Sequence, residues 1–346
     1  MHKKSTYFFL IPVVLVLALF AFNFDLLIYG IAQGQGQLRI IWNARQISQV
    51  LTDPATPDSI KEKLNYIASV RDYAIDSLGL SNTDNYTTYF EQNGKEIMWV
   101  VTACEPYLLK EKIWEFPIAG KVPYKGFFSI NKAKVEAAIW KDHGLDVSIR
   151  NPGGWSTLGW FTDPILSGML NRSKGDLASL IIHEMAHATI YVKDSSTFNE
   201  NLASFIGDEG AKKFLKSRYG AQSSELQEFE QEDRDYRIWV DHFLRGAAAL
   251  DSLYSRSDFY HLSDSIKREK KYDLIRKIVE STDTLKLSVP SNYRLRSRKE
   301  LPNNTYFMSF IRYQAMQTDF TGLYQSKFNL QILPMIEFFR KSHPFN

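Results

Sequence analysis

Residues 177–188 constrain the possible folds of this chain more than any other segment does. They place His183, Glu184 and His187 inside an otherwise uncharged helical segment. Two histidines four residues apart lie one turn above each other on a helix, so both imidazoles can reach one metal ion, with the glutamate beside them. The alternative is an ordinary amphipathic helix whose two histidines are hydrogen-bonded within the protein. The spacing favours a zinc hydrolase over that alternative.

A zinc hydrolase needs three protein ligands and one open position for water, whose pKa the metal lowers. His183 and His187 would supply two ligands to a single Zn²⁺ ion. Glu184 would be the catalytic base, which takes a proton from the attacking water and passes it to the leaving amine. We expect the third ligand at Glu200, on the next helix, although residues 197–200 also fit a capping box in which this glutamate only bonds backbone.

Other side chains could complete the site. The fallback ligands are three acidic residues and three more distant histidines: Asp194, Asp208, Glu209, His143, His242 and His261. Peptide hydrolysis also needs a donor for the oxyanion, for which Tyr306 and Tyr313 are the candidates. No acidic residue stands out as the group that binds the amino end of a substrate.

The amino terminus predicts an export or anchor segment. A basic start precedes an apolar run over residues 7–22, and apolar residues resume as far as Ile31. Because no A-x-A cleavage site follows the run, we expect one transmembrane helix within residues 1–32. The lysines would hold its first end in the cytoplasm, so that residues 33–346, the catalytic domain, face the periplasm or the cell exterior.

The rest of the chain predicts one helix-rich α+β domain. Short aromatic and β-branched runs between residues 82 and 159 indicate a small sheet just before the motif helix, and an edge strand there could hold an extended peptide over the metal. The expected strands span residues 96–103, 126–129 and 145–149. The expected helices span residues 38–51, 59–78, 132–141 and 173–192, and another begins near residue 197.

Composition excludes several classes of protein. The net charge is only +3, and no basic block or RNA- or DNA-binding motif is present, so nucleic acid is not an expected partner. The single cysteine, Cys104, rules out an intrachain disulfide and a multi-cysteine metal site. It lies in an apolar run, which predicts a buried thiol on a strand rather than a nucleophile.

Two family resemblances follow from these motifs. His183-Glu184-x-x-His187 with Asn199-Glu200-x-x-Ala203 resembles the gluzincins, the zinc metallopeptidases with a glutamate ligand, although the interval between the two motifs is shorter here. The chain after the anchor also resembles a family of bacterial zinc aminopeptidases. That second resemblance is carried by Gly36-Gln37-Leu38, Phe116-Pro117-x-x-Gly120, Tyr124-x-Gly126-x-Phe128, Ser156-Thr157-Leu158-Gly159-Trp160-Phe161-x-Asp163-Pro164 and Phe198-Asn199-Glu200.

The resemblance implies a zincin-like catalytic domain and a membrane-anchored, zinc-dependent aminopeptidase that acts on peptides. Two departures stand out: Trp155 replaces an expected tyrosine, and the lipid-attachment cysteine of many relatives is missing. Residues 156–160 are a candidate substrate-binding edge. The rival interpretation is a membrane-tethered helical binding or scaffold protein with a structural or inactive zinc site, in which the charged helices of residues 223–281 form the partner surface.

Overall fold

The computed structural model describes residues 24–116, 120–152, 162–293 and 301–343. The chain divides into two compact units, Met1–Ala44 and Arg45–Asn346. The described element of the first unit is the helix α2 (Phe24–Asn43). The boundary predicted at residue 32 falls within α2, and the assignment of residues 33–346 to one catalytic domain stays a prediction.

The helix α2 corrects the expectation of a membrane anchor. Residues 1–23 lie outside the described part of the chain, and none of the helices within that part combines the length and apolar character needed to cross a membrane. The predicted transmembrane helix is therefore wrong, and so is the extracytoplasmic location inferred from it. The sequence of α2 explains why this helix is not apolar enough. It continues through residues 33–37, where glutamines alternate with glycines and where a polar connector was expected.

The second unit is a helix-rich α+β fold, but its strands form three small sheets rather than one. The central sheet has the order β6-β3-β7 and is antiparallel throughout. The other two sheets have the orders β1-β2-β8 and β4-β5. The strands are β1 (Arg45–Gln46), β2 (Thr88–Phe90), β3 (Trp99–Cys104), β4 (Trp114–Phe116), β5 (Gly120–Val122), β6 (Lys125–Phe127), β7 (Asp146–Arg150) and β8 (Ile165–Leu166).

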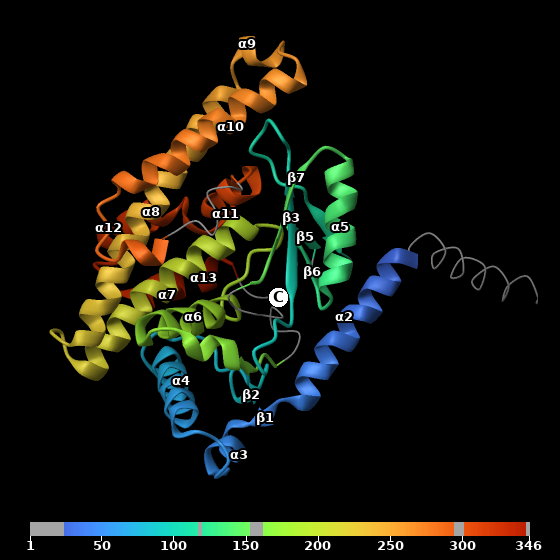
Figure 1. The fold of residues 1–346 in the computed structure, drawn as a ribbon. Coiled ribbons are helices and arrows are strands. Elements are labelled where there is room, and N and C mark those ends of the chain that lie inside the picture. Colours follow the sequence, from blue (N-terminus) through green and yellow to red (C-terminus); the bar gives the residue numbers. More distant parts are fainter. Residues whose placement is uncertain (1–23, 117–119, 153–161, 294–300, 344–346) are drawn as a thin grey trace, which may run out of the picture. The chain divides into compact units, whose positions relative to one another are not determined.

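The strand β3 is the core of the central sheet. All of its residues after Trp99 are buried, because the helix α5 (Ile130–Asp142) covers one face and α11 (Asn304–Gln314) packs against the other. Figure 1 shows α5 on one side of this sheet and the helices α6, α7 and α11 on the other. Cys104 is a buried free cysteine at the end of β3, as predicted, and burial raises the pKa of its thiol to about 12.

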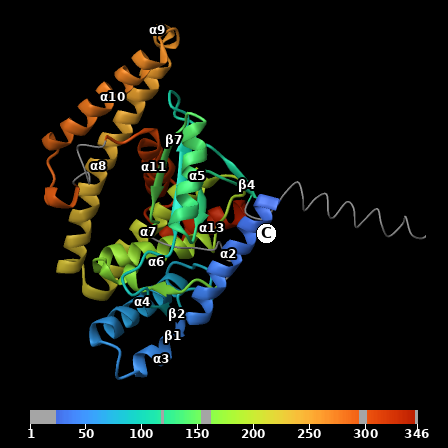
Figure 2. The ribbon, with the colours of Figure 1, turned by 45° about the vertical axis from the view of Figure 1, so that its right-hand side comes forward.

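Two antiparallel helices form the centre of the helical layer, α6 (Lys174–His187) and α7 (Ser196–Tyr219), and they lie side by side in both ribbon views (Figures 1 and 2). Their backbones approach closely at Gly207, where a Cβ atom would lie 2.8 Å from the carbonyl oxygen of Ser179. Around them lie α4 (Asp58–Asp76), α8 (Ser224–Tyr254), α11, α12 (Gln317–Ser326) and α13 (Ile332–Ser342).

The long helix α8 pairs with α10 (Asp264–Glu280), and the short α9 (Ser257–Tyr260) joins them (Figure 1). An aromatic cluster from α8 and α11 belongs to the same core as apolar residues of α10, with Phe243 stacked on Phe310 at a ring distance of 5.0 Å. The charged character of residues 223–281 therefore belongs to helices with one buried apolar face, and it does not require a partner protein.

The remaining differences from expectation concern helix ends. The helix expected over residues 38–51 is divided by β1 into α2 and α3 (Ile47–Thr52). The motif helix ends at His187 rather than near residue 192, and the next helix, α7, begins at Ser196, close to the expected start near residue 197. Three short 3₁₀ helices complete the described chain: Ser167–Asn171, Ser281–Thr284 and Pro290–Tyr293.

Candidate metal centre

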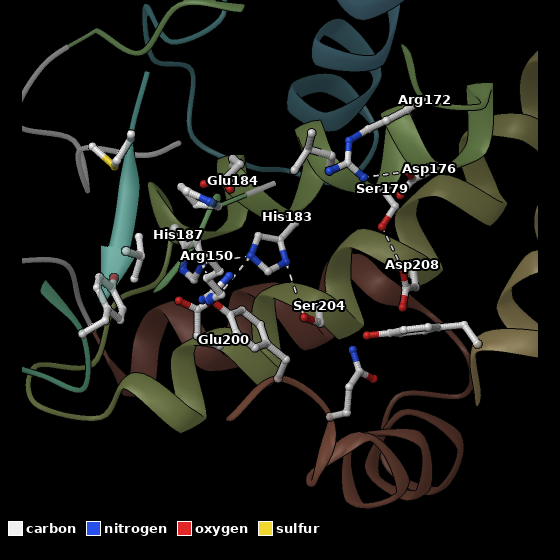
Figure 3. Close-up of a pocket in the computed structure, with 18 residues that line it drawn as sticks. Arg150, Arg172, Asp176, Ser179, His183, Glu184, His187, Glu200, Ser204 and Asp208 are labelled. Atoms are coloured by element: carbon white, nitrogen blue, oxygen red, sulfur yellow. Dashed lines mark hydrogen bonds and ion pairs between the residues drawn. The ribbon is translucent and has the colours of Figure 1, made fainter. Parts of the chain in front are cut away.

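The helix α6 presents both motif histidines to the same point. It begins after Ser173, whose hydroxyl accepts a hydrogen bond from the Asp176 backbone nitrogen at 3.2 Å, and its apolar residues are buried. The Nε2 atoms of His183 and His187 lie 3.1 Å apart (Figure 3). The four-residue spacing therefore brings the two imidazoles close enough to bind one metal ion together.

Glu200 reaches the same point from α7. One of its carboxylate oxygens, Oε2, lies 3.5 Å from His183 Nε2 and 3.3 Å from His187 Nε2. The helix begins at Ser196 after the cap residue Ser195, so Glu200 lies beyond the third helical position that a capping box would need. Together His183, His187 and Glu200 could hold a metal ion.

The spacing of these donor atoms is compatible with a zinc ion. Zinc binds imidazole nitrogen at about 2.0–2.1 Å and carboxylate oxygen at about 2.0–2.2 Å, so two tetrahedral ligands lie about 3.3–3.6 Å apart. The three separations here are 3.1, 3.3 and 3.5 Å. Behind the donors, His183 Nδ1 lies 3.5 Å from the hydroxyl of Ser204, whereas the buried His187 Nδ1 has no hydrogen-bond partner within the described residues.

Electrostatics keep Glu200 ionised. Burial alone would raise the pKa of this carboxyl, but the two imidazoles lower it well below its ordinary value. Burial likewise opposes the charged form of His187, and the Glu200 carboxylate outweighs that effect and raises the histidine pKa. Glu200 therefore offers the acceptor-only carboxylate that binding of a cation requires.

The residues beside Glu200 hold the connection between α6 and α7 in place. The side chain of Asn199 accepts a hydrogen bond from the Val192 nitrogen and donates one to the Val192 oxygen, both at 2.8 Å. Asn201 donates to the Arg312 carbonyl at 2.7 Å and accepts from the Met316 nitrogen at 2.8 Å, which ties α7 to α11. These two asparagines fix the part of α7 that carries Glu200 against the neighbouring segments.

The three donors line a cavity of about 450 Å³, and Glu184 lies in its wall beside them (Figure 3). The wall residues contributed from outside α6 and α7 come mainly from the central sheet, α8 and α11: Met98, Val100, Tyr124, Arg150, Pro152, Arg172, Tyr236, Tyr313 and Gln314. Sequence reasoning missed Arg150 and Tyr236. Tyr124 was named only as part of a family motif. For Arg150, the one sequence feature that could have indicated a functional role was its position at the end of a strand.

The two tyrosine candidates differ in position. Tyr313 lines the cavity, and Arg150 donates to its hydroxyl at 3.4 Å. Burial, with the nearby Glu200 carboxylate, raises the pKa of Tyr313, so its hydroxyl stays protonated and can donate. Tyr306 instead packs its ring against Phe243 and Phe310 in the aromatic cluster and does not line the cavity.

None of the fallback ligands joins the three donors. Within the described chain, His183, His187 and Glu200 are the one group of this kind close enough to share an ion. Asp194 has a left-handed φ of 58° in the turn before α7 and accepts from the Lys121 nitrogen at 3.0 Å. Asp208 lines the cavity further along, bonded to the Ser179 hydroxyl, and Glu209 pairs with Lys212.

The three fallback histidines lie elsewhere. His143 bonds the Ile139 carbonyl at the end of α5, and His242 bonds the Ile278 carbonyl. His261 is exposed and stacks edge-on with Tyr260. The proposed substrate edge at residues 156–160 and the position Trp155 lie outside the described residues, so that prediction stays untested.

Comparison with known proteins places the chain in a family. Searches of curated proteins and of solved structures found no match. The model of a family described as "Putative aminopeptidase" matches residues 28–333, a segment that contains all three donor residues and Glu184. The chain therefore belongs to the putative aminopeptidase family.

Proposed function

We propose that this protein is a zinc-dependent aminopeptidase in which His183, His187 and Glu200 hold one Zn²⁺ ion. The observation that carries the proposal is the convergence of three donor atoms at separations of 3.1–3.5 Å, beside Glu184 and in the wall of a cavity. Membership of the putative aminopeptidase family supports a peptide as the substrate. A cavity of about 450 Å³ falls within the range that binds small ligands.

Zinc, when bound by these residues, supplies a Lewis acid that polarises the peptide carbonyl and lowers the pKa of a water molecule. Glu184 takes a proton from the attacking water and delivers it to the leaving amine. Its side chain has no hydrogen-bond or ion-pair partner in the described part of the chain, which leaves the carboxylate available to water and substrate. The Tyr313 hydroxyl, with Arg150 beside it, donates to the oxyanion as the carbonyl is attacked.

The site also favours catalysis over a structural role for the metal. Structural zinc sites are closed by four protein ligands, whereas catalytic sites have three and leave one position open. Here three residues converge, and all three line the cavity. This arrangement supports an enzyme over the rival binding or scaffold protein.

Metal analysis of the purified protein tests the proposal. We expect about one zinc per chain and hydrolysis of peptides with a free amino terminus, and both should be lost in His183→Ala. The control is His143→Ala, since that exposed histidine lies outside the site. A folded wild-type sample that takes up no zinc when zinc is supplied would overturn the proposed function.

A further inference from the structure

The helices α6 and α7 face each other through three polar pairs, all of which line the cavity. His187 lies 3.3 Å from Glu200, His183 lies 3.5 Å from Ser204, and Ser179 donates to Asp208 at 2.7 Å. From one pair to the next, the α6 residue is four positions earlier in the sequence and the α7 residue is four positions later. Successive pairs are therefore about one helical turn apart. Figure 3 shows this row leading from Glu200 past His183 and Ser204 to Asp208.

Asp208, at the far end of the row, is a carboxylate without a cationic partner of its own in the described chain. Its Oδ1 atom accepts the Ser179 hydroxyl, while the nearest basic side chains, Lys212 and Arg237, form their ion pairs with Asp233. Burial and the negative charge of Asp233 together raise the Asp208 pKa to about 6. The positive charge of a bound ammonium group would offset both effects, because it favours the ionised carboxylate.

The other acidic groups of the cavity are already engaged. Asp176 forms an ion pair with Arg172 at 2.6 Å, and Glu200 lies against the two histidines. Glu184 is assigned as the base. Among the described cavity residues, Asp208 is therefore the carboxylate that remains for the positive end of a peptide.

The distance from Asp208 to the metal centre sets the length of peptide between them. An α-helix rises about 1.5 Å per residue. Along α7, Asp208 therefore lies about 6 Å from Ser204, which is level with His183, and about 12 Å from Glu200. The centre of the three donors lies between these levels, about 9 Å from Asp208. An extended chain spans about 3.3–3.6 Å per residue, so two to three residues bridge the gap.

We propose that Asp208 binds the α-amino group of the substrate, so that the enzyme releases dipeptides or tripeptides rather than single amino acids. The proposal rests on the proposed function, because it assumes cleavage at the metal centre. A single-residue aminopeptidase would hold the amino group within about 4 Å of the scissile carbonyl, one residue length away. The carboxylates at that range, Glu184 and Glu200, have other roles.

Product analysis of the zinc-loaded, full-length protein tests the length. Hexapeptides with free and acetylated amino termini are incubated with the enzyme, and early products are identified by mass spectrometry. We expect dipeptides or tripeptides from the free peptide and much slower cleavage of the acetylated one. Release of single amino acids would overturn this proposal alone, whereas no cleavage of any peptide would overturn the proposed function and this proposal together.

The variant Asp208→Asn tests the residue, because asparagine keeps an acceptor for Ser179 and loses the charge. We expect the KM for the free peptide to rise about tenfold or more, with zinc content unchanged and cleavage of the acetylated peptide no slower. Glu209→Gln is the matched control, since Glu209 pairs with Lys212 and does not line the cavity. An unchanged preference for the free over the acetylated peptide in Asp208→Asn would overturn the assignment.

A binding measurement on the metal-free protein gives a second readout that does not depend on cleavage. Calorimetric titration with trialanine and with acetylated trialanine compares the affinity for a free amino terminus with that for a blocked one. We expect the wild-type protein to bind the free peptide more tightly and Asp208→Asn to bind both equally. Equal binding of both peptides by the wild-type protein would contradict a carboxylate that recognises the amino group.

Discussion

Lys271 and Glu200 are both charged side chains held largely away from solvent, with 2% and 14% of the side chain exposed. Lys271 donates to Asp146 at 2.5 Å and to the Pro106 carbonyl at 2.9 Å. The same Asp146 oxygen accepts from the Asn304 backbone nitrogen at 2.9 Å. This group is closed: each charge meets an opposite charge or a dipole, and the bonds tie α10, β7 and α11 together.

The group around Glu200 is organised in the opposite way. Three atoms that all attract a cation converge, and the group borders a cavity. Its buried His187 Nδ1 lacks a hydrogen-bond partner among the described residues. A closed polar network holds a fold together, whereas a convergent and incompletely satisfied one is suited to bind a ligand. Substitutions in the two groups should therefore separate folding from function.

The largest effect is expected from Glu184→Gln, which should reduce kcat by about 10²–10⁴-fold because the amide cannot take up a proton. Zinc content and the free energy of unfolding should stay close to those of the wild-type protein. Steady-state kinetics, metal analysis and urea denaturation check the three quantities. Full activity in this variant would show that another residue is the base.

Lys271→Met should reduce the free energy of unfolding by about 3–5 kcal/mol, because it leaves Asp146 buried without its counter-charge. Urea denaturation measures the loss. The double variant Lys271→Met with Asp146→Asn should recover part of it, since the buried charge is then removed. If the single variant were as stable as the wild type, the closed group would not contribute to folding.

Asn199→Ala should reduce the free energy of unfolding by about 1–3 kcal/mol, because the buried asparagine satisfies both backbone groups of Val192. It should also weaken zinc binding, since Glu200 is the next residue. Competition with a zinc indicator measures the affinity. Asn304→Ala is the comparison: the buried Asn304 side chain donates to the Pro106 carbonyl and accepts from the Tyr254 hydroxyl, so its loss should reduce stability and leave zinc affinity unchanged.

The smallest effect concerns Asp208 and depends on pH. Its pKa is about 6 in the folded protein against 3.8 ordinarily, so between these values the folded state binds more protons than the unfolded state. Stability therefore falls as pH rises from about 4 to 6, and the penalty is complete above pH 6. Asp208→Asn cannot titrate and should be more stable by about 1–2 kcal/mol at pH 7 but not at pH 4.

Urea denaturation at the two pH values checks this prediction. The other charged groups around Asp208 are Asp233, Lys212 and Arg237, which Asp208→Asn leaves unchanged. A stability difference that is the same at pH 4 and pH 7 would mean that the ionisation of Asp208 is not its cause.

The sequence by itself determined the local parts of this protein. The four-residue spacing of His183 and His187 and the helical period are enough to put both imidazoles on one side of α6. The apolar run ending at Cys104 was enough to predict a buried strand. The helix-rich α+β character was equally predictable, because it follows from periodicity along the chain.

At two places the local sequence pattern was not sufficient: one expectation failed there, and one alternative could not be decided. Polar and glycine residues over 33–37 predicted a break, yet α2 continues through them, since such residues weaken a helix without excluding it. Residues 197–200 also fit a capping box, the alternative to a Glu200 ligand, but the cap residue of α7 is Ser195, two residues earlier, and Glu200 lies against the histidines. A cap and a ligand use the same residue types, and only the position of the neighbouring helix distinguishes them.

Only the tertiary structure decided what surrounds His183, His187 and Glu200. Arg150 comes from the end of β7, Tyr313 from α11 and Asp208 from the second half of α7, and no local pattern relates them. The division into three sheets was also decided only by the tertiary structure, because the parallel pairing of β2 with β8 joins distant segments of the chain. Such contacts depend on how whole elements pack, so the cavity and its row of polar pairs were not visible in the sequence.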